Sequence, residues 1–284
     1  MGALRVQGKT PQQLAEQRIA IVGAGSAGIG VAQVLLQAMI EHGVSMEDAK
    51  ECFFVLDANG LLDQNQSYLT HEQRMFARDE DGGMNLYQVV KKYKPTMILG
   101  MTGIGGIFKE EIIREMAKHC PRPVIFPLSN PTIKAECTAT QAFTWTDGQC
   151  IFASGSPFDP VTLPNGRTFY TSQCNNMYIF PGLGLGATIC GAERITDKML
   201  YLAAETLANQ VTPEELSQGK VFPHISKIRD VSKNIAMTVI EEAQRDGQAT
   251  KLRGKYIEDM EEYVRSKMYD PVYVPLVEKR RDFT

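Results

Sequence analysis

The sequence predicts an α/β fold in which a doubly wound parallel sheet is followed by a C-terminal helical segment. Three observations support this prediction. Short apolar runs alternate with helical patterns from residue 18 to residue 154, which is typical of a parallel sheet covered on both faces. A glycine-rich loop joins the first apolar run to the first helical pattern. Beyond residue 176 the runs of strand length stop and helical periodicity takes their place.

Five apolar runs have the length of buried strands, and turn residues end several of them. They are residues 18–22, 52–57, 96–100, 123–128 and 150–154. Helical spacing predicts helices at 29–40, 45–51 and 109–119. Ser45 is placed to cap the second of these, with Asp48 at the capping-box position. The tetrapeptide Pro-Asn-Gly-Arg at 164–167 predicts a hairpin turn.

The first loop, Gly-Ala-Gly-Ser-Ala-Gly, has the spacing of a dinucleotide-binding turn between a strand and a helix. In such a turn Gly23 allows the tight bend, Gly25 lets the backbone approach a pyrophosphate, and Gly28 lets the helix pack on the strand. Ser26 and Ala27 then present N–H groups at the positive end of the helix dipole. A purely structural turn is the alternative, but the flanking strand and helix favour a Rossmann-like dinucleotide site.

Two further features fit a dinucleotide that crosses the sheet. Asp57 ends the second predicted strand, where an acidic residue can accept hydrogen bonds from the adenine ribose. It lies further from the loop than the usual roughly 20 residues because the helix at 45–51 intervenes; a simple turn residue is the alternative. A second glycine cluster at 100–106 follows the third strand. Ligands bind beyond the carboxyl ends of such strands, so Thr102 and Gly103 are expected to contact the cofactor.

Composition narrows the class of protein. The 284 residues include 30 basic and 33 acidic residues and carry a net charge of −3, so nucleic acid and anionic membranes are not expected partners. The apolar runs are shorter than a membrane span requires. The six cysteines are scattered without metal-binding spacing, which indicates reduced thiols in the cytoplasm or, in a eukaryote, an organelle matrix.

Five longer motifs resemble those of malic enzymes and occur in the same order. They are LSNPT (128–132), AECT (135–138), FASGSPF (152–158), NNMYIFPG (175–182) and MYDPVY (268–273). The resemblance covers roughly residues 5–276 and points to the C-terminal, NAD-binding portion of a malic enzyme. It implies an NAD(P)-binding Rossmann-like domain at residues 1–176. Residues 177–284 would form a helical segment that, in the family, packs on an N-terminal catalytic half.

The resemblance also implies a reaction and roles for three asparagines. Malic enzymes oxidise (S)-malate with NAD or NADP and a divalent cation, and release pyruvate and CO2. Asn130 and Asn176 would contact the substrate, Asn130 would also contact the nicotinamide end, and Asn175 would orient the nicotinamide ribose or amide. Neutral amides suit these roles because they donate to a carboxylate and leave it charged. For Asn130, a purely structural role in an Asn-Pro turn is the alternative.

Two residues bear on the choice between NAD and NADP. A ribose phosphate ~5 Å from Asp57 would be repelled by about 3 kcal/mol per charge at an effective dielectric of ~20. NADP-dependent malic enzymes keep this aspartate and rely on a nearby lysine, which we align with Gln73. The neutral Gln73 favours NAD as the cofactor, although Arg74 beside it is a cation within reach of a phosphate.

The metal ligands and proton-transfer residues of the family have no counterpart in this chain. The family binds Mg or Mn through a Glu-Asp pair and an aspartate of Phe-Asn-Asp-Asp-Ile-Gln-Gly-Thr, and it moves protons with a tyrosine and a lysine. We therefore predict no catalytic and no metal-binding residue here. The chain is expected to be a piece of a longer polypeptide and to be inactive alone, because the cation polarises the carbonyl.

Two other functions fit the sequence: a malolactic enzyme, which shares the framework and NAD but yields lactate, and a non-catalytic dinucleotide-binding regulatory module. An apolar patch after the asparagine pair is expected to be exposed and to be covered by self-association or a partner chain. Its residues are Ile179, Phe180, Leu183, Leu185 and Ile189. A homo-oligomer is the expected assembly.

Overall fold

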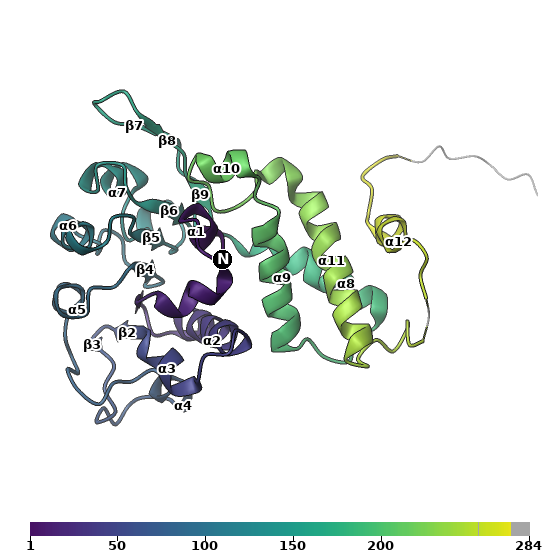
Figure 1. Ribbon diagram of the computed structural model, residues 1–284, viewed down its shortest axis with the longest axis horizontal. Helices are drawn as coiled ribbons and strands as arrows, with labels where there is room; N and C mark the ends of the chain where they lie inside the picture. The colour runs from purple at the N-terminus through teal and green to yellow at the C-terminus, as the bar shows by residue number, and fades with distance from the viewer. Residues whose placement is uncertain (255, 274–284) are drawn as a thin grey trace, which may run out of the picture.

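The computed structural model describes residues 1–254 and 256–273, with a sheet covered by helices at one end and further helices at the other (Figure 1). The seven strands of the sheet are β1 (Ile19–Val22), β2 (Phe53–Asp57), β3 (Gly60–Leu61), β4 (Met97–Gly100), β5 (Val124–Pro127), β6 (Ile151–Ser154) and β9 (Ser172–Gln173). Their order is β3-β2-β1-β4-β5-β6-β9, and only the β2–β3 pairing is antiparallel. The predicted doubly wound parallel sheet is confirmed, except that the edge strand β3 is antiparallel.

Every strand predicted from an apolar run is present, within one or two residues at each end. The predicted hairpin is also present: β7 (Val161–Thr162) pairs antiparallel with β8 (Thr168–Phe169) across the turn. The edge strands β3 and β9 were not predicted. Each contains two residues, which is too short for any alternation of apolar and polar residues to be visible.

The strands alternate their side chains between two apolar cores, one on each face of the sheet. In β2, Phe53 and Val55 belong to one core, while Phe54 and Leu56 belong to the other. The first face is covered by α2 (Ser26–Glu41) and α3 (Met46–Glu51), and the second by α5 (Leu86–Tyr93), α6 (Glu110–His119) and α7 (Ala139–Trp145). Shorter elements are α1 (Gly2–Val6), η1 (Pro11–Glu16), α4 (His71–Arg74), η2 (Thr132–Lys134), η3 (Asn176–Tyr178), α10 (Pro213–Ser217) and η4 (Ile225–Lys227).

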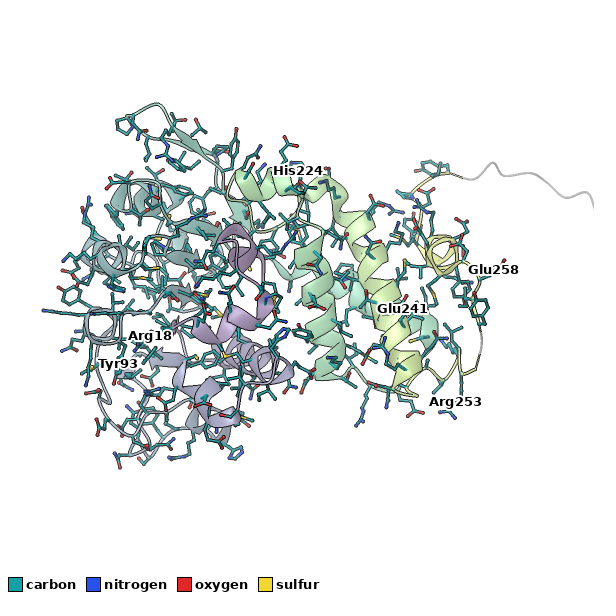
Figure 2. The ribbon with its side chains drawn as sticks, viewed as in Figure 1. Arg18, Tyr93, His224, Glu241, Arg253 and Glu258 are labelled. Atoms are coloured by element: carbon teal, nitrogen blue, oxygen red, sulfur yellow. The ribbon has the colours of Figure 1, made fainter. Side chains whose placement is uncertain are left out.

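The amino-terminal edge of the sheet is closed by aromatic and cationic side chains. Arg18 and Tyr93, both labelled on the sheet end of the molecule in Figure 2, lie against the buried ring of Phe54. The Arg18 guanidinium carbon is 5.6 Å from the centre of that ring, and the ring centres of Phe54 and Tyr93 are 4.5 Å apart. Such contacts stabilise this edge. The glycine loops lie at the opposite, carboxyl-terminal ends of the strands.

Beyond residue 176 the chain is helical, as predicted, with α8 (Phe180–Cys190), α9 (Asp197–Asn209), α11 (Ile228–Arg245) and α12 (Met260–Lys267). α11 buries an apolar stripe in the helical core: Val231, Ile235 and Val239 are fully buried. Within the described ranges, none of the helices is both long and apolar enough to cross a membrane.

The expected apolar patch on α8 is largely wrong. Leu183 is buried, and the side chains of Ile179, Leu185 and Ile189 are half-buried against the helical core. The glycines of α8 bring α11 so close that it covers this face: a Cβ atom at Gly182 would lie 2.6 Å from the Ser232 carbonyl oxygen. Phe180 is the member of the predicted patch that is exposed, at 62%.

Polar contacts join the helical end of the molecule to the sheet end. The Tyr201 hydroxyl on α9 forms a 2.9 Å hydrogen bond with His42 Nε2 at the end of α2. Beside it the Lys198 ammonium lies 2.5 Å from the Glu41 carboxylate. Tyr201 also belongs to the apolar core beneath α2. The domain boundary near residue 176 therefore stays a prediction, because α9 packs on the sheet domain as well as on α11.

Candidate functional site

The glycine loop between β1 and α2 has the shape that its sequence predicts. Gly23 has φ of 113°, and a Cβ atom there would lie 2.4 Å from the Met101 carbonyl oxygen. A Cβ atom at Gly28 would lie 1.8 Å from the Gly23 carbonyl oxygen, so only glycine lets α2 pack this closely on the turn. At Gly25 a Cβ atom would meet nothing within 4 Å. The loop is thus tight on its inner side and open on its outer side.

The open side of the loop is the amino terminus of α2, a helix of 16 residues with Gly25 as its N-cap. Gly25, Ser26 and Ala27 are exposed there, and their first N–H groups have no partner within the helix. These groups and the positive end of the helix dipole suit an anion. The geometry therefore fits the pyrophosphate of a dinucleotide at this position.

Asp57 lies at the tip of β2 in a small hydrogen-bonded network. The backbone N–H of Asn59 donates to Asp57 Oδ1 at 2.7 Å, and the Tyr68 hydroxyl donates to Oδ2 at 3.1 Å. The Asn59 side-chain amide donates in turn to the Tyr68 hydroxyl at 3.1 Å. A carboxylate has about four acceptor positions, so an oriented Asp57 can still accept from a ribose diol. Tyr68 had no role in the sequence prediction, because its contact with Asp57 arises from loop geometry.

The two residues considered for phosphate recognition are both engaged. Gln73, on α4, donates from its side-chain amide to the Ala24 carbonyl of the glycine loop at 2.8 Å. Arg74 donates from its guanidinium to the backbone carbonyls of Gln64 and Gln66, at 3.0 and 3.1 Å. The neutral Gln73 thus faces the loop, and the charge of Arg74 is held on main-chain oxygens.

The second glycine cluster lies directly beside the first. The Met101 N–H donates to the Val22 carbonyl at 2.7 Å, which continues the β1–β4 pairing up to both loops. β1 and β4 are the strands between which the sheet order reverses, and ligands bind in the crevice at such a point. In the second loop Thr102 is half-buried and Gly103 is exposed. The two glycine loops therefore lie side by side at this point, and their contact with a cofactor stays a prediction.

Asn130 follows β5 on the same edge and is exposed, with a cis peptide bond to Pro131. Its Oδ1 accepts a 2.6 Å hydrogen bond from the Ser156 hydroxyl. A Cβ atom at Gly155 would lie 2.7 Å from Asn130 Nδ2, so that glycine makes room for the amide. Asn130 Nδ2 also donates to the Leu128 carbonyl oxygen at 3.5 Å. The side chain is therefore oriented by its neighbours at both ends of the amide.

Asn175 and Asn176 come immediately after β9 and the strand extension at Cys174, whose N–H donates to the Ser154 carbonyl at 2.8 Å. Asn175 accepts the Met177 N–H at 3.0 Å and caps η3, while Asn176 is exposed. Parallel β5, β6 and β9 end at one edge of the sheet. The three predicted asparagines therefore share that edge, with only β6 between the strands they follow.

Glu136 is a member of this site to which the sequence prediction gave no role. It lies after β5, its side chain is fully buried, and its carboxylate accepts hydrogen bonds from both Thr102 and Ser129. The AECT motif that contains it was visible in the sequence, but its contact with the second glycine cluster spans a separation that local patterns do not reveal.

Candidate metal ligands are not grouped in the described residues. Among residues 1–254 and 256–273 there is no group of three or more histidine, cysteine, aspartate or glutamate side chains that could hold a metal ion. The four histidines are far apart in sequence. The residues present therefore do not fit the divalent cation of the expected reaction, and no step through it follows from this structure.

Comparison with known proteins places this site in a family. Residues 1–244 match the family described as the NAD-binding domain of malic enzyme. The chain is 48% identical over 261 residues to an NADP-dependent malic enzyme of Dictyostelium discoideum, covering 91% of this chain and 47% of the relative. It is 42% identical to a human mitochondrial NADP-dependent malic enzyme, covering 96% of this chain and 44% of that protein. The chain spans about half the length of these relatives.

Two solved malic enzyme structures have a similar fold. The malic enzyme from Pyrococcus horikoshii Ot3 superposes with a TM-score of 0.70 at 26% identity, over 94% of this chain and 55% of that one. The malic enzyme of Entamoeba histolytica gives a TM-score of 0.71 over 94% of this chain and 50% of that one. Its identity is 19%, so it bears on the fold alone.

Proposed function

Because the chain belongs to the malic enzyme family, we propose that it is the NAD-binding part of an enzyme that converts (S)-malate to pyruvate and CO2. The observation that carries this proposal is that the β1 and β4 loops lie side by side where the strand order reverses. The oriented acid Asp57 follows β2 on one side of this point, and Asn130 and Asn176 follow β5 and β9 on the other. This layout offers one end to an adenosine and the other to a nicotinamide and a small carboxylic acid.

Different groups of residues would bind the different parts of the cofactor. Gly23, Gly25, Ser26, Ala27 and Gly28 would receive the pyrophosphate at the start of α2. Asp57 would accept from the adenine ribose hydroxyls. Thr102, Gly103, Asn130 and Asn175 would line the nicotinamide half. When bound, the nicotinamide supplies the two-electron oxidant of the reaction.

Asn130 and Asn176 would orient malate through its carboxylate groups. An amide N–H₂ can donate two hydrogen bonds without neutralising the anion. The malate carboxylate therefore stays ionised, as it must be to leave as CO2. Ser156 supports this role because its hydroxyl donates to Asn130 Oδ1, so Nδ2 is the side of the amide that could donate to the substrate. One of the two Nδ2 hydrogens points to the Leu128 carbonyl oxygen at 3.5 Å, so the other would be the donor.

We favour NAD over NADP although the relatives quoted above are named NADP-dependent. The argument rests on charge: the Asp57 carboxylate would repel a ribose phosphate by about 3 kcal/mol per charge at ~5 Å. Gln73 is neutral where a lysine would offset that repulsion, and the Arg74 guanidinium is held on two carbonyls. A ribose diol meets none of this repulsion and can donate to Asp57.

We also propose that the chain does not turn over malate by itself. The described residues would supply binding groups for the cofactor and substrate, but they include no cluster that could hold the divalent cation. The metal ligands and the proton-transfer groups would come from the rest of a malic enzyme. This chain matches only about half of the length of its relatives.

Product analysis of the polypeptide that contains this chain tests the proposed activity. With malate, NAD and Mg, we expect pyruvate to form in equal amounts with NADH, and the Asn176→Ala variant to raise the KM for malate. Formation of lactate without net NADH, or no malate-dependent product under any metal, would contradict the proposal. Asn209→Ala, at the end of α9, is the control substitution and should leave the KM unchanged.

A further inference from the structure

The Glu136 carboxylate is buried at the meeting point of the second glycine cluster and the turn after β5. Its side chain has 0% exposure. Among the described residues no lysine, arginine or histidine forms an ion pair with it. Burial of an acid without a cation is strongly unfavourable unless hydrogen bonds satisfy it. The groups that donate hydrogen bonds to Glu136 therefore identify the segments that this residue holds in place.

Four donors converge on this carboxylate, two from each loop. Thr102 donates to Oε1 from its backbone N–H at 3.0 Å and from its hydroxyl at 2.8 Å. Ser129 donates to Oε1 from its hydroxyl at 2.5 Å and to Oε2 from its backbone N–H at 3.3 Å. All four are N–H or O–H groups that point at carboxylate oxygens, which is the pattern of an ionised acid.

A relay extends this arrangement to Gly103. The Gly103 N–H donates to the Ser129 hydroxyl oxygen at 2.8 Å, so the proton of that hydroxyl is directed to Glu136. The carboxylate thereby fixes the backbone of Thr102 and Gly103 on one side and of Ser129, the neighbour of Asn130, on the other. These are the segments that would line the nicotinamide half of the crevice.

The backbone around Glu136 supports the same contact. The Glu136 carbonyl accepts the Phe108 N–H at 2.9 Å, beyond the far end of the glycine cluster. On the near side, a Cβ atom at Gly100 would lie 2.5 Å from the carboxyl carbon of Glu136. The end of β4 therefore has room for the acid only because residue 100 is glycine.

We propose that Glu136 is a positioning residue for the nicotinamide half of the cofactor, and that its negative charge favours the oxidised form. The proposal rests on the proposed dinucleotide site. Oxidised nicotinamide carries a positive charge on its ring and reduced nicotinamide does not. A buried anion behind the loop that receives the ring attracts the oxidised form selectively, because the low-dielectric surroundings screen the charge weakly.

Binding measurements on the full chain with three ligands separate the two halves of the site. ADP-ribose contains the adenosine and both phosphates but lacks the nicotinamide, so its affinity reports on the glycine loop and Asp57. NAD and NADH report on the complete site and differ in ring charge. We would measure all three by calorimetry for the wild-type chain, Glu136→Gln and Glu258→Gln, an exposed control residue labelled in Figure 2.

Glutamine matches glutamate in size, but its amide N–H₂ would face the Ser129 N–H and it carries no charge. Glu136→Gln should weaken NAD about tenfold or more. It should leave ADP-ribose within about twofold of wild type and weaken NAD more than NADH. Equal weakening of NAD and ADP-ribose, or NAD binding as in wild type, would overturn the inference while leaving the dinucleotide site intact.

Ser129→Ala covers the case in which Glu136→Gln does not fold. It removes the relay hydroxyl and keeps the carboxylate, so it should weaken NAD and NADH to the same extent and spare ADP-ribose. Unchanged NAD affinity in Ser129→Ala would contradict the positioning role. If the wild-type chain binds neither NAD nor ADP-ribose, the proposed function itself fails and this inference falls with it.

Discussion

The side-chain amide of Gln73 donates a 2.8 Å hydrogen bond to the backbone carbonyl of Ala24. This bond ties α4 to the glycine loop between β1 and α2, although the two residues are far apart in the sequence. It also holds a neutral side chain against the glycine loop. The resemblance to malic enzymes aligns Gln73 with a lysine of the NADP-dependent members, so the residue that would differ between the two cofactor types is in contact with this loop.

Replacing Gln73 with lysine is expected to raise the affinity for NADP. The new cation would offset the repulsion between Asp57 and a ribose phosphate, so we expect about a tenfold gain for NADP. The affinity for NAD should change little or fall, because the bond to Ala24 is lost. Calorimetric titration with both dinucleotides measures this, and Gln12→Lys, an exposed change on η1, controls for net charge. An NADP affinity that rises equally in both variants would contradict the prediction.

Alanine substitutions at Gly25 and Gly28 are expected to separate binding from stability. Gly28→Ala places a Cβ atom 1.8 Å from the Gly23 carbonyl oxygen and should destabilise the chain by about 1–3 kcal/mol. Gly25→Ala meets nothing within 4 Å and has φ of −74°, so stability should hold while the methyl group obstructs the pyrophosphate. Urea unfolding and NAD titration give the two readings. A Gly25→Ala variant that unfolds at a lower urea concentration than the wild type, or that binds NAD as tightly as the wild type, would contradict these two predictions.

His119 is expected to make the stability of the chain depend on pH. Burial lowers the pKa of His119 below its usual value, so the unfolded chain binds a proton more readily than the folded one. The stability linked to this residue is present above its unfolded pKa of about 6.5 and is lost as the pH falls through the folded pKa. His119→Gln should therefore flatten the decline in urea midpoint below pH 7. His71→Gln, at an exposed position, should leave the decline as it is.

Two cysteines are expected to resist alkylation in the folded chain. Burial raises the pKa of the Cys150 thiol to about 12 and that of the Cys174 thiol to about 11, so little thiolate forms at pH 8. A time course with iodoacetamide, read by mass spectrometry, should show slow modification of both sites. Addition of urea exposes the thiols and lets them ionise as in an unfolded chain, so both rates should rise. Rapid labelling of Cys150 in the native chain would mean that β6 is less well packed than described.

Local sequence patterns predicted the parts of the fold that local forces determine. β1, β2, β4, β5 and β6 are apolar runs that must be buried, and the glycine spacing of 23–28 is imposed by the tight turn itself. The two-residue strands β3 and β9 lack such a pattern, because pairing with a neighbour defines them. These two strands form only where the neighbouring strands β2 and β6 are in place to pair with them.

The parts of the site that escaped prediction depend on contacts between distant segments. Tyr68 reaches Asp57 through a loop, and Glu136, which follows β5, reaches Thr102 in the loop after the neighbouring strand β4. The prediction of an exposed α8 face failed for the same reason. Leu183 is apolar and adjacent to the asparagine pair, but α11 approaches close enough to bury it. Only the positions of the glycines in α8 hinted at that approach.

Calorimetric titration of the chain with NAD, in the wild type and in Asp57→Ala, tests the central claim most directly. Asp246→Ala, an exposed change at the end of α11, serves as the matched control. The account predicts saturable NAD binding that weakens about tenfold or more in Asp57→Ala and is unchanged in the control. It also predicts that NADP binds about 100-fold more weakly than NAD. Equal binding of NAD by wild type and Asp57→Ala, or tighter binding of NADP, would contradict it.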